Sequence, residues 1–283
     1  MHEANKLPVN FFSLFSIAFQ PFAYIFRLLI TKHIAMAKGL PNKYQLIMVV
    51  VLFVLLLSGC SKDELTYPVK VNFSIGINQS SNPQAYINLS QAVVGVGSIG
   101  FVGLRQEGGD VHFDTEPGKT HGTYVIRAGE SARYVTYFDI PQGVYDLMSW
   151  KLTLAEIDDD VYEDEITDSD DYGLLIKGSY GPIGSDSIPV YFLIDPMEVF
   201  SCEATDALGA TPISIVEGNS YTILLELNPT EAVEGISRNY FDNASISYGD
   251  EGEAFILISE EDNVSAYQLF LFRLARTLKA TVK

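Results

Sequence analysis

The chain has 283 residues, of which 18 are Lys or Arg and 36 are Asp or Glu, so its formal net charge is −18. Residues 1–59 hold five of the 18 basic residues and one of the 36 acids, which leaves residues 60–283 with 13 basic and 35 acidic residues and a net charge of −22. A region this acidic repels nucleic acid and anionic lipid headgroups, which excludes a nucleic-acid partner and purely electrostatic attachment to a membrane. Two cysteines, Cys60 and Cys202, are too few for a disulfide framework or a cysteine zinc site.

Residues 1–35 do not match a recognisable leader. The stretch 9–30 is mostly apolar, but Gln20 and Pro21 interrupt it. We interpret 1–35 as an upstream extension ahead of a true start at Met36. The alternative is an additional membrane helix, because the apolar stretch is nearly long enough to span a bilayer.

Residues 36–59 have the layout of a secretory signal peptide. Lys38 and Lys43 precede twelve consecutive apolar residues, 46–57, and two small residues follow. The apolar run is short for a spanning helix, which needs about 20 residues. Residues 36–59 are therefore predicted to be removed from the mature protein.

The end of this segment, Leu57-Ser58-Gly59-Cys60, resembles the lipobox of bacterial lipoproteins. The resemblance implies that the Cys60 thiol receives a diacylglycerol and that cleavage before Cys60 makes it the first residue. Two or three acyl chains anchor a protein firmly, whereas one chain is marginal. Acyl chains thus attach the acidic domain to the membrane although anionic lipid headgroups repel it. The alternative is an ordinary signal peptide or membrane anchor with an incidental cysteine.

The next four residues, Ser61, Lys62, Asp63 and Glu64, bear on the destination. Ser61 is not the aspartate that marks inner-membrane retention in such lipoproteins. A charged, acid-containing stretch after the cysteine is similar to the surface-export signal of Bacteroidota lipoproteins. We expect a lipid-anchored protein on the outer face of the outer membrane, with residues 60–66 as a tether.

Alternation of apolar and polar residues dominates the chain after residue 66. Residues 67–77, YPVKVNFSIGI, place apolar side chains at every second position, which is typical of a strand with one buried face. Gly- and Pro-containing turns separate further runs, which predict strands at 123–128, 132–140, 148–154, 188–194, 221–227 and 253–258. We expect 67–283 to be one mainly β domain, an antiparallel β-sandwich of the immunoglobulin or transthyretin kind and not a parallel sheet.

Helical features appear late in the chain. Residues 259–262, SEED, have the form of a capping box, and apolar residues follow at helical spacing over 267–278. A short C-terminal helix is therefore predicted, with a possible final strand over 277–283. Residues 228–231, NPTE, and 195–198, DPME, each follow a predicted strand and predict a single helical turn.

The most acidic stretch, 156–171, is a candidate calcium site. It has ten carboxylates in 16 residues, and Ca²⁺ takes six to eight oxygen ligands. The candidate ligands are Asp158, Asp160, Asp168 and Asp170. The stretch departs from an EF-hand because a tyrosine occupies one ligand position and a serine replaces the bidentate glutamate. A solvated acidic loop without metal is the alternative that we prefer, and no other cofactor is predicted.

Two further motifs are weaker. Residues 95–100 match the GxGxxG dinucleotide fingerprint by letter, but no helix pattern follows to bind phosphate, so we predict a glycine-rich strand or bend. His112 and His121, with Asp114 and Glu116, are possible metal ligands. The turn residues between the histidines indicate a hairpin tip equally well.

Three single residues complete the candidates. Asp186-Ser187-Ile188 resembles the short O-glycosylation motif of Bacteroidota secreted proteins, which makes Ser187 a candidate modification site. Trp150 is predicted to pack in the core, and Cys202 to pack as a small apolar residue. Nucleophile motifs such as Gly-x-Ser-x-Gly are absent from the sequence, so no catalytic residue is predicted.

As a whole, the chain resembles β-sandwich lipoproteins of Bacteroidota, some of which have transthyretin- or fimbrillin-like folds, although only residues 57–64 are specific. The resemblance implies a non-catalytic role in binding a glycan or a protein partner. The alternatives are a structural or pilus-type assembly subunit and a small envelope hydrolase. Converging carboxylates in a concave pocket would indicate the hydrolase, and a displaced terminal strand would indicate assembly.

Overall fold

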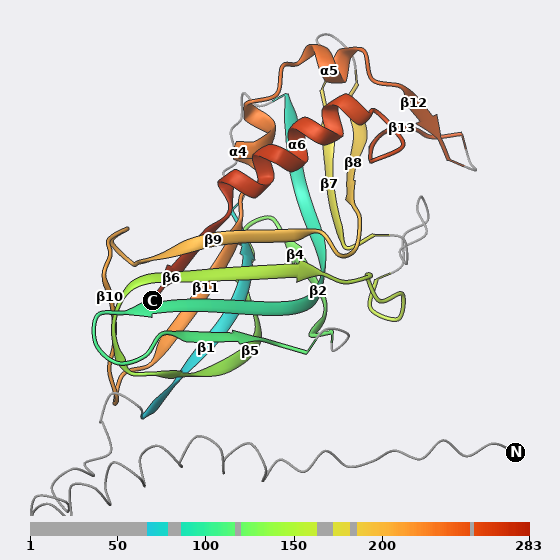
Figure 1. The fold of residues 1–283 in the computed structure, drawn as a ribbon. Coiled ribbons are helices and arrows are strands. Elements are labelled where there is room, and N and C mark those ends of the chain that lie inside the picture. Colours follow the sequence, from blue (N-terminus) through green and yellow to red (C-terminus); the bar gives the residue numbers. More distant parts are fainter. Residues whose placement is uncertain (1–66, 79–85, 117–119, 163–171, 182–185, 250–251) are drawn as a thin grey trace, which may run out of the picture. The chain divides into compact units, whose positions relative to one another are not determined.

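The structure, a computed structural model, describes residues 67–78, 86–116, 120–162, 172–181, 186–249 and 252–283. These residues are mainly β, as predicted (Figure 1). The strands are β1 Pro68–Ile77, β2 Ile87–Arg105, β3 Val111–Asp114, β4 Gly122–Arg127, β5 Arg133–Pro141, β6 Gly143–Leu154, β7 Leu174–Tyr180, β8 Ile188–Ile194, β9 Val199–Asp206, β10 Ile213–Ile215, β11 Tyr221–Leu227, β12 Ile246–Tyr248, β13 Ala254–Ile258 and β14 Lys279–Val282. The helices are α4 Pro229–Glu234, α5 Asn239–Asp242 and α6 Val264–Thr277.

The seven strands predicted from alternation are all present, as β1, β4, β5, β6, β8, β11 and β13. The glycine-rich stretch 95–100 lies inside the long strand β2, so the prediction of a strand there is confirmed. The C-terminal helix is confirmed as α6, and the possible final strand as β14.

The helix starts were predicted less well. Asn228 caps α4 as expected, with its side chain accepting a hydrogen bond from the Glu231 amide. Residues 195–198 form a turn instead of a helical turn. The Ser259 hydroxyl caps a separate turn by accepting from the amides of Glu261 and Asp262, and α6 begins only after Asn263.

The prediction of an antiparallel immunoglobulin- or transthyretin-like sandwich is not confirmed, because the strands form one large mixed sheet. Its order is β12-β13-β8-β7-β2-β6-β9-β14-β11-β1-β5, with β10 on β6, and β3 and β4 on β2. Three neighbouring pairs are parallel: β1 with β11, β13 with β8, and β14 with β9. The sheet is therefore mixed and not purely antiparallel. Helix α6 connects β13 to β14, and both of these strands form parallel pairs.

Strand β2 is continuous, but along each of its edges two shorter strands follow one another, with the break between them near the middle of β2. β6 and then β7 run along one edge of β2, and β3 and then β4 run along its other edge. Farther out, β8 pairs with β7 and β9 pairs with β6. β13 then pairs with β8, and β14 pairs with β9. The sheet therefore divides into two lobes that share β2. One lobe, which ends at β1 and β5, curls into a half-barrel, and the other carries the helices (Figure 1).

Gly95 lies in β2 at the level where the neighbouring strands are interrupted. Its amide donates to Gly173, just before β7, and its carbonyl accepts from Ala155, just after β6. A Cβ at Gly95 would stand 2.1 Å from the Ala155 carbonyl oxygen, closer than non-bonded atoms approach. Glycine is required here because a strand must be closely approached by another backbone.

We predict that Gly95→Ala lowers the free energy of unfolding by between about 1 and 3 kcal/mol, the usual cost of overpacking. Urea denaturation followed by circular dichroism would measure the change. Gly109→Ala is the matched control, because no atom lies within 4 Å of its Cβ position, and it should have almost no effect. Equal stability of the two variants would contradict the role assigned to Gly95.

The core of the half-barrel is aromatic. Trp150 is 1% exposed, and four phenylalanine rings surround it with centroid distances between 4.7 and 6.1 Å. These rings come from four different strands: Phe73 of β1, Phe101 of β2, Phe113 of β3 and Phe138 of β5. Trp150 therefore packs in the core, as predicted.

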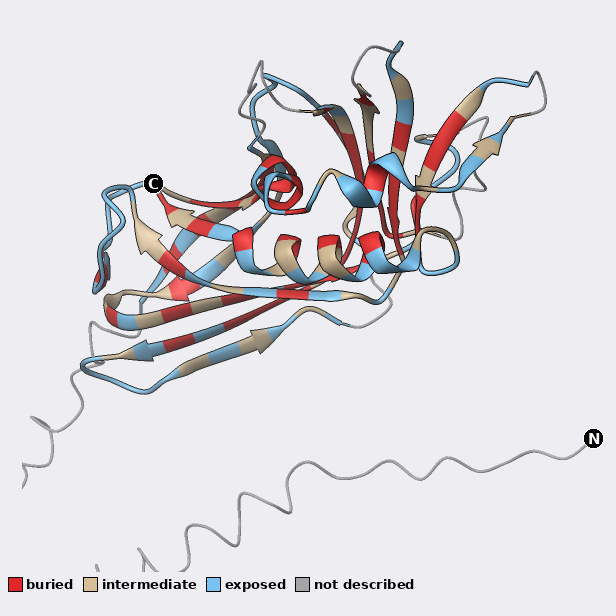
Figure 2. Ribbon diagram, turned by 90° about the horizontal axis from the view of Figure 1, so that it is seen from above, coloured by how far each residue is buried: buried red, intermediate tan, exposed pale blue. Residues whose placement is uncertain are grey.

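The second lobe has a helical layer on one face of its strands. Helix α6 buries one side, including Phe270, whose ring lies 4.2 Å from that of Phe192 on β8 (Figure 2). The opposite face of these strands packs against Ile157, near the start of the acidic stretch, in a small cluster with Val93, Leu175 and Leu193. In the described part of the chain, no helix has the length and apolar character needed to cross a bilayer.

Candidate functional site

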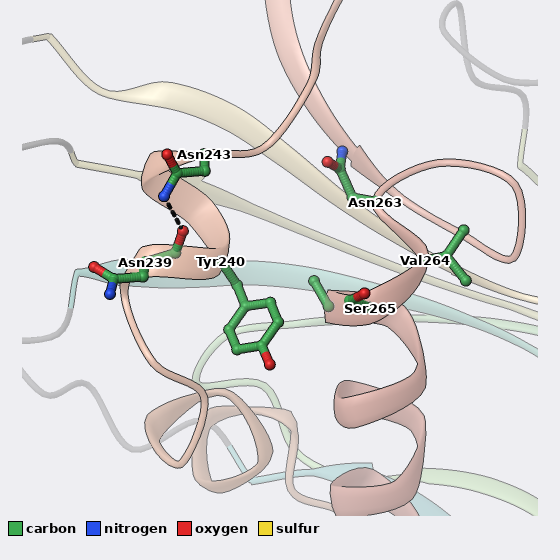
Figure 3. A pocket seen from close by; sticks show the side chains of 7 residues that line it. Asn239, Tyr240, Asn243, Asn263, Val264 and Ser265 are labelled. Carbon is green, nitrogen blue, oxygen red and sulfur yellow. Dashed lines mark hydrogen bonds between the residues drawn. The ribbon is translucent and has the colours of Figure 1, made fainter.

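A cleft of about 350 Å³ lies between α5 and the first turn of α6, and we call it the α5–α6 cleft (Figure 3). Its wall contains three asparagines, one tyrosine, one serine and two small apolar residues. None of them is an acid, a lysine, an arginine or a histidine. The lining residues are Asn239, Tyr240, Asn243, Asn263, Val264, Ser265 and Ala266.

Asn263 fixes one wall of this cleft. Its backbone is left-handed, with φ of 52°, a conformation that asparagine adopts more readily than most residues. Its side-chain oxygen accepts from the Ser245 amide at 2.8 Å, and its nitrogen donates to the carbonyls of Leu257 at 2.7 Å and Ser245 at 3.2 Å. The side chain thus ties the start of α6 to β13 and to the segment before β12.

Helix α5 forms the opposite wall, and contacts with the end of β7 hold it in place. Arg238 donates to the Gly181 carbonyl at 2.7 Å, and its Nε lies 3.5 Å from the Asp242 carboxylate. The Tyr180 hydroxyl also donates to Asp242, and Phe241 is buried. These contacts fix a helix of only four residues, so its exposed side presents Tyr240 in a defined position.

The polar groups of the lining differ in how far they are available to a ligand. Within the described residues, the Asn239 carboxamide and the Tyr240 hydroxyl make no hydrogen bond. The Tyr240 side chain is 41% exposed and lies between α5 and the first turn of α6 (Figure 3). By contrast, the Asn243 nitrogen is used within α5, where it donates to the Asn239 carbonyl at 2.8 Å. The Asn239 carboxamide points away from α6, so the cleft itself offers the aromatic face of Tyr240 and the hydroxyls of Tyr240 and Ser265 (Figure 3).

No family model, curated protein or solved structure matches this chain.

The predicted lipidation and export residues, 57–64 including Cys60, lie outside the described residues, so these predictions remain open. Ser187 is exposed immediately before β8, and its glycosylation also remains a prediction. Cys202 packs partly buried against the core, as predicted, and burial raises its thiol pKa to about 12. Its thiol is therefore protonated near neutral pH.

The calcium prediction remains open, because two of its four candidate ligands lie outside the described residues. Asp158 and Asp160 are exposed, and the Asp160 amide donates to the Asp158 side chain at 3.0 Å, which closes a local turn. Asp168 and Asp170 lie outside the described residues. Among the residues that are described, no group of three or more His, Cys, Asp or Glu side chains is placed to hold a metal.

The two histidines do not join a larger polar site. His112 is exposed on β3, while His121 is half-buried just before β4. The His121 Nε2 lies 3.5 Å from the Thr115 hydroxyl, and burial lowers the pKa of the ring. β3 and β4 each pair with β2 and not with each other, so the two strands do not form the expected hairpin. Among the described residues, neither histidine belongs to a group of side chains placed to hold a metal.

A carboxyl pair that sequence reasoning missed lies where β8 passes into β9. Asp195 and Glu260 share a side-chain hydrogen bond, which requires a proton on one of them. Burial raises the pKa of Asp195 to about 6, helped by this bond and by the charges of Glu260, Glu198 and Glu261. The Tyr267 hydroxyl accepts from the Asp195 amide, and burial raises its pKa to about 12. None of these residues lines the α5–α6 cleft.

We predict that Asp195→Asn stabilises the protein at pH 8 but not at pH 4. The folded pKa is above the ordinary value of 3.8, so the neutral form stabilises the fold at low pH, and this stability is lost as the pH rises through about 6. Melting temperatures at pH 4 to 8 would show the gap between variant and wild type opening across that range. Glu203→Gln, on the exposed face of β9, should show no such opening. A constant gap for Asp195→Asn would contradict the assignment.

Proposed function

We propose that the protein is a lipid-anchored module of the outer membrane, exposed on the cell surface, that binds a ligand reversibly in the α5–α6 cleft. The anchor is supported by the sequence LSGC at 57–60 and by the charge of −22, which gives the domain no electrostatic affinity for lipid. Its partners are the membrane, through the acyl chains, and a glycan or protein ligand.

The observation that carries binding over catalysis is the lining of the cleft. Among the seven lining residues, only Ser265 and Tyr240 carry a hydroxyl that could act as a nucleophile. No histidine or carboxylate lines the cleft to act as a general base for the Ser265 hydroxyl. The carboxyl pair Asp195–Glu260 is outside the lining and gives the hydrolase alternative no substrate cavity.

The assembly alternative receives no support from the C-terminal strand. β14 lies inside the sheet, antiparallel to β11 on one side and parallel to β9 on the other. A strand paired on both sides is not displaced, and its removal would break two hydrogen-bonded ladders.

The test uses the acylated mature protein reconstituted in liposomes. Envelope polysaccharide and peptide fractions would be applied to immobilised liposomes, and ligand masses would be recorded before and after binding. We expect saturable, reversible binding with no change in ligand mass. Cleaved ligand would support the hydrolase instead, and absence of any retained ligand relative to empty liposomes would overturn the proposal.

A further inference from the structure

We propose that the α5–α6 cleft binds one or two units of an uncharged saccharide, with a sugar ring stacked on Tyr240 and hydroxyl groups bonded to Ser265, which lies across from Tyr240 (Figure 3). This inference rests on the proposed function, since it names the ligand class of the same site. It is carried by the size, the charge and the hydrogen-bonding capacity of the cleft.

The size restricts the ligand. A volume of about 350 Å³ lies near the lower limit for ligand sites, which span about 300–1,000 Å³. Such a space accommodates a small ring system or a short part of a chain, and excludes a folded partner as the group that enters it. An oligosaccharide end or an internal unit fits this limit.

The charge of the surroundings selects a neutral ligand. The seven lining residues include no cation to pair with a phosphate, sulfate or carboxylate and no anion to pair with an amine. The surrounding domain is strongly acidic, so an anionic ligand would be repelled before reaching the cleft. Polar recognition must therefore come from neutral donors and acceptors.

The available groups match a polyhydroxyl ligand. The hydroxyls of Tyr240 and Ser265 each supply a donor and an acceptor. The exposed Tyr240 ring offers a face on which the C–H side of a sugar ring can stack. A sugar hydroxyl also donates and accepts, so every one of these groups finds a partner.

An extended peptide is the main competing ligand, because β12 is an edge strand with Ile246 and Tyr248 exposed. Strand addition draws its affinity from a run of main-chain hydrogen bonds. β12 has only three residues, and the cleft lies between two helix ends, with no strand among its lining residues. These features favour the saccharide.

The test measures binding affinity by calorimetric titration. The full-length protein in detergent micelles is titrated with maltotetraose, cellotetraose and chitotetraose. An oligogalacturonate and a pool of pentapeptides serve as charged and peptide probes. We expect at least one neutral tetrasaccharide to bind, at least 10-fold more weakly to Tyr240→Ala, and about 3-fold more weakly to Ser265→Ala and to Tyr240→Phe, each of which loses one hydroxyl. Tyr134→Ala, which removes an exposed tyrosine from β5, should bind like the wild type.

Several results would overturn the inference. These are no binding of any neutral tetrasaccharide at 10 mM, equal binding to Tyr240→Ala, or preference for the oligogalacturonate. Binding of pentapeptides that depends on Tyr240 would refute the saccharide while leaving reversible binding at the cleft intact. Loss of both saccharide and peptide binding would count against the proposed function as well. Unchanged Trp150 fluorescence would show that each variant is folded.

Discussion

Replacing Cys60 with serine should abolish acylation and reduce the amount of protein in the outer membrane at least 10-fold. A hydroxyl cannot replace the thiol as the acceptor of the diacylglycerol, and the expected cut before residue 60 depends on that modification. Acyl chains contribute about 0.8 kcal/mol per buried CH₂, and a domain with a charge of −22 has no second attraction to lipid.

Intact-mass spectrometry of the purified protein and membrane fractionation would measure both effects. The wild type should begin at a diacylated Cys60, and the variant should retain its leader without acyl mass. Cys202→Ser is the matched control, because that thiol packs in β9, and it should be acylated and located like the wild type. If Cys60→Ser were found in the outer membrane in wild-type amounts, this result would contradict the lipid anchor at Cys60 and would favour a membrane helix within residues 1–35.

Truncation of Trp150 to alanine should lower the free energy of unfolding by about 3–5 kcal/mol, as expected for the loss of a large buried ring. The ring lies among four phenylalanines from four strands, so its removal leaves a cavity that no single neighbour can fill. The loss is a large fraction of the 5–15 kcal/mol that stabilises a typical domain. Partial unfolding at 37 °C is the expected consequence.

Urea denaturation followed by far-ultraviolet circular dichroism would measure this loss, because the variant lacks the tryptophan signal. Trp150→Phe keeps an aromatic ring in place and should lose much less. Tyr134→Ala removes a ring that is more than half exposed and should change stability by no more than about 0.5 kcal/mol. If Trp150→Ala were as stable as Tyr134→Ala, the aromatic cluster would not be the centre of the core.

Strands with one buried face were predictable from alternation, whereas among those with two buried faces only β8 was predicted over its whole length, as a short apolar run. β1 alternates clearly, with Val71, Phe73 and Ile75 inside, because its outer face is polar. β2 was found only as a glycine-rich stretch, since residues 92–97 are buried on both faces and lose the period of two. β9 is short of large apolar residues and gave no signal.

The pairing of the strands could not be predicted. Parallel pairing of β14 with β9 depends on where α6 ends on the sheet. That position is determined by the packing of α6 against residues distant from it in the sequence. The start of α6 was misplaced because Ser259 caps its own turn, and because Asn263 begins the helix with a left-handed backbone instead of a side-chain cap.

The cleft also had no recognisable sequence signal. Tyr240 and Phe241 are adjacent and aromatic, yet one is 41% exposed and the other is 2% exposed. Only the position of α5 on the sheet separates these roles. Asparagine has no motif that distinguishes a lining residue from a turn residue, so Asn239 and Asn263 could be recognised only with the structure in hand.

The level at which the strands are interrupted has a consequence for the evolution of this chain. Additional residues can enter between β6 and β7, or between β3 and β4, without altering the pairing of any strand, since both flanking strands hold β2 independently. Lengthening a loop costs only slowly increasing entropy. One residue added within β2 would turn its side chains to the opposite face. Natural variation in length should therefore accumulate along this line, which also makes it the place to graft a foreign epitope.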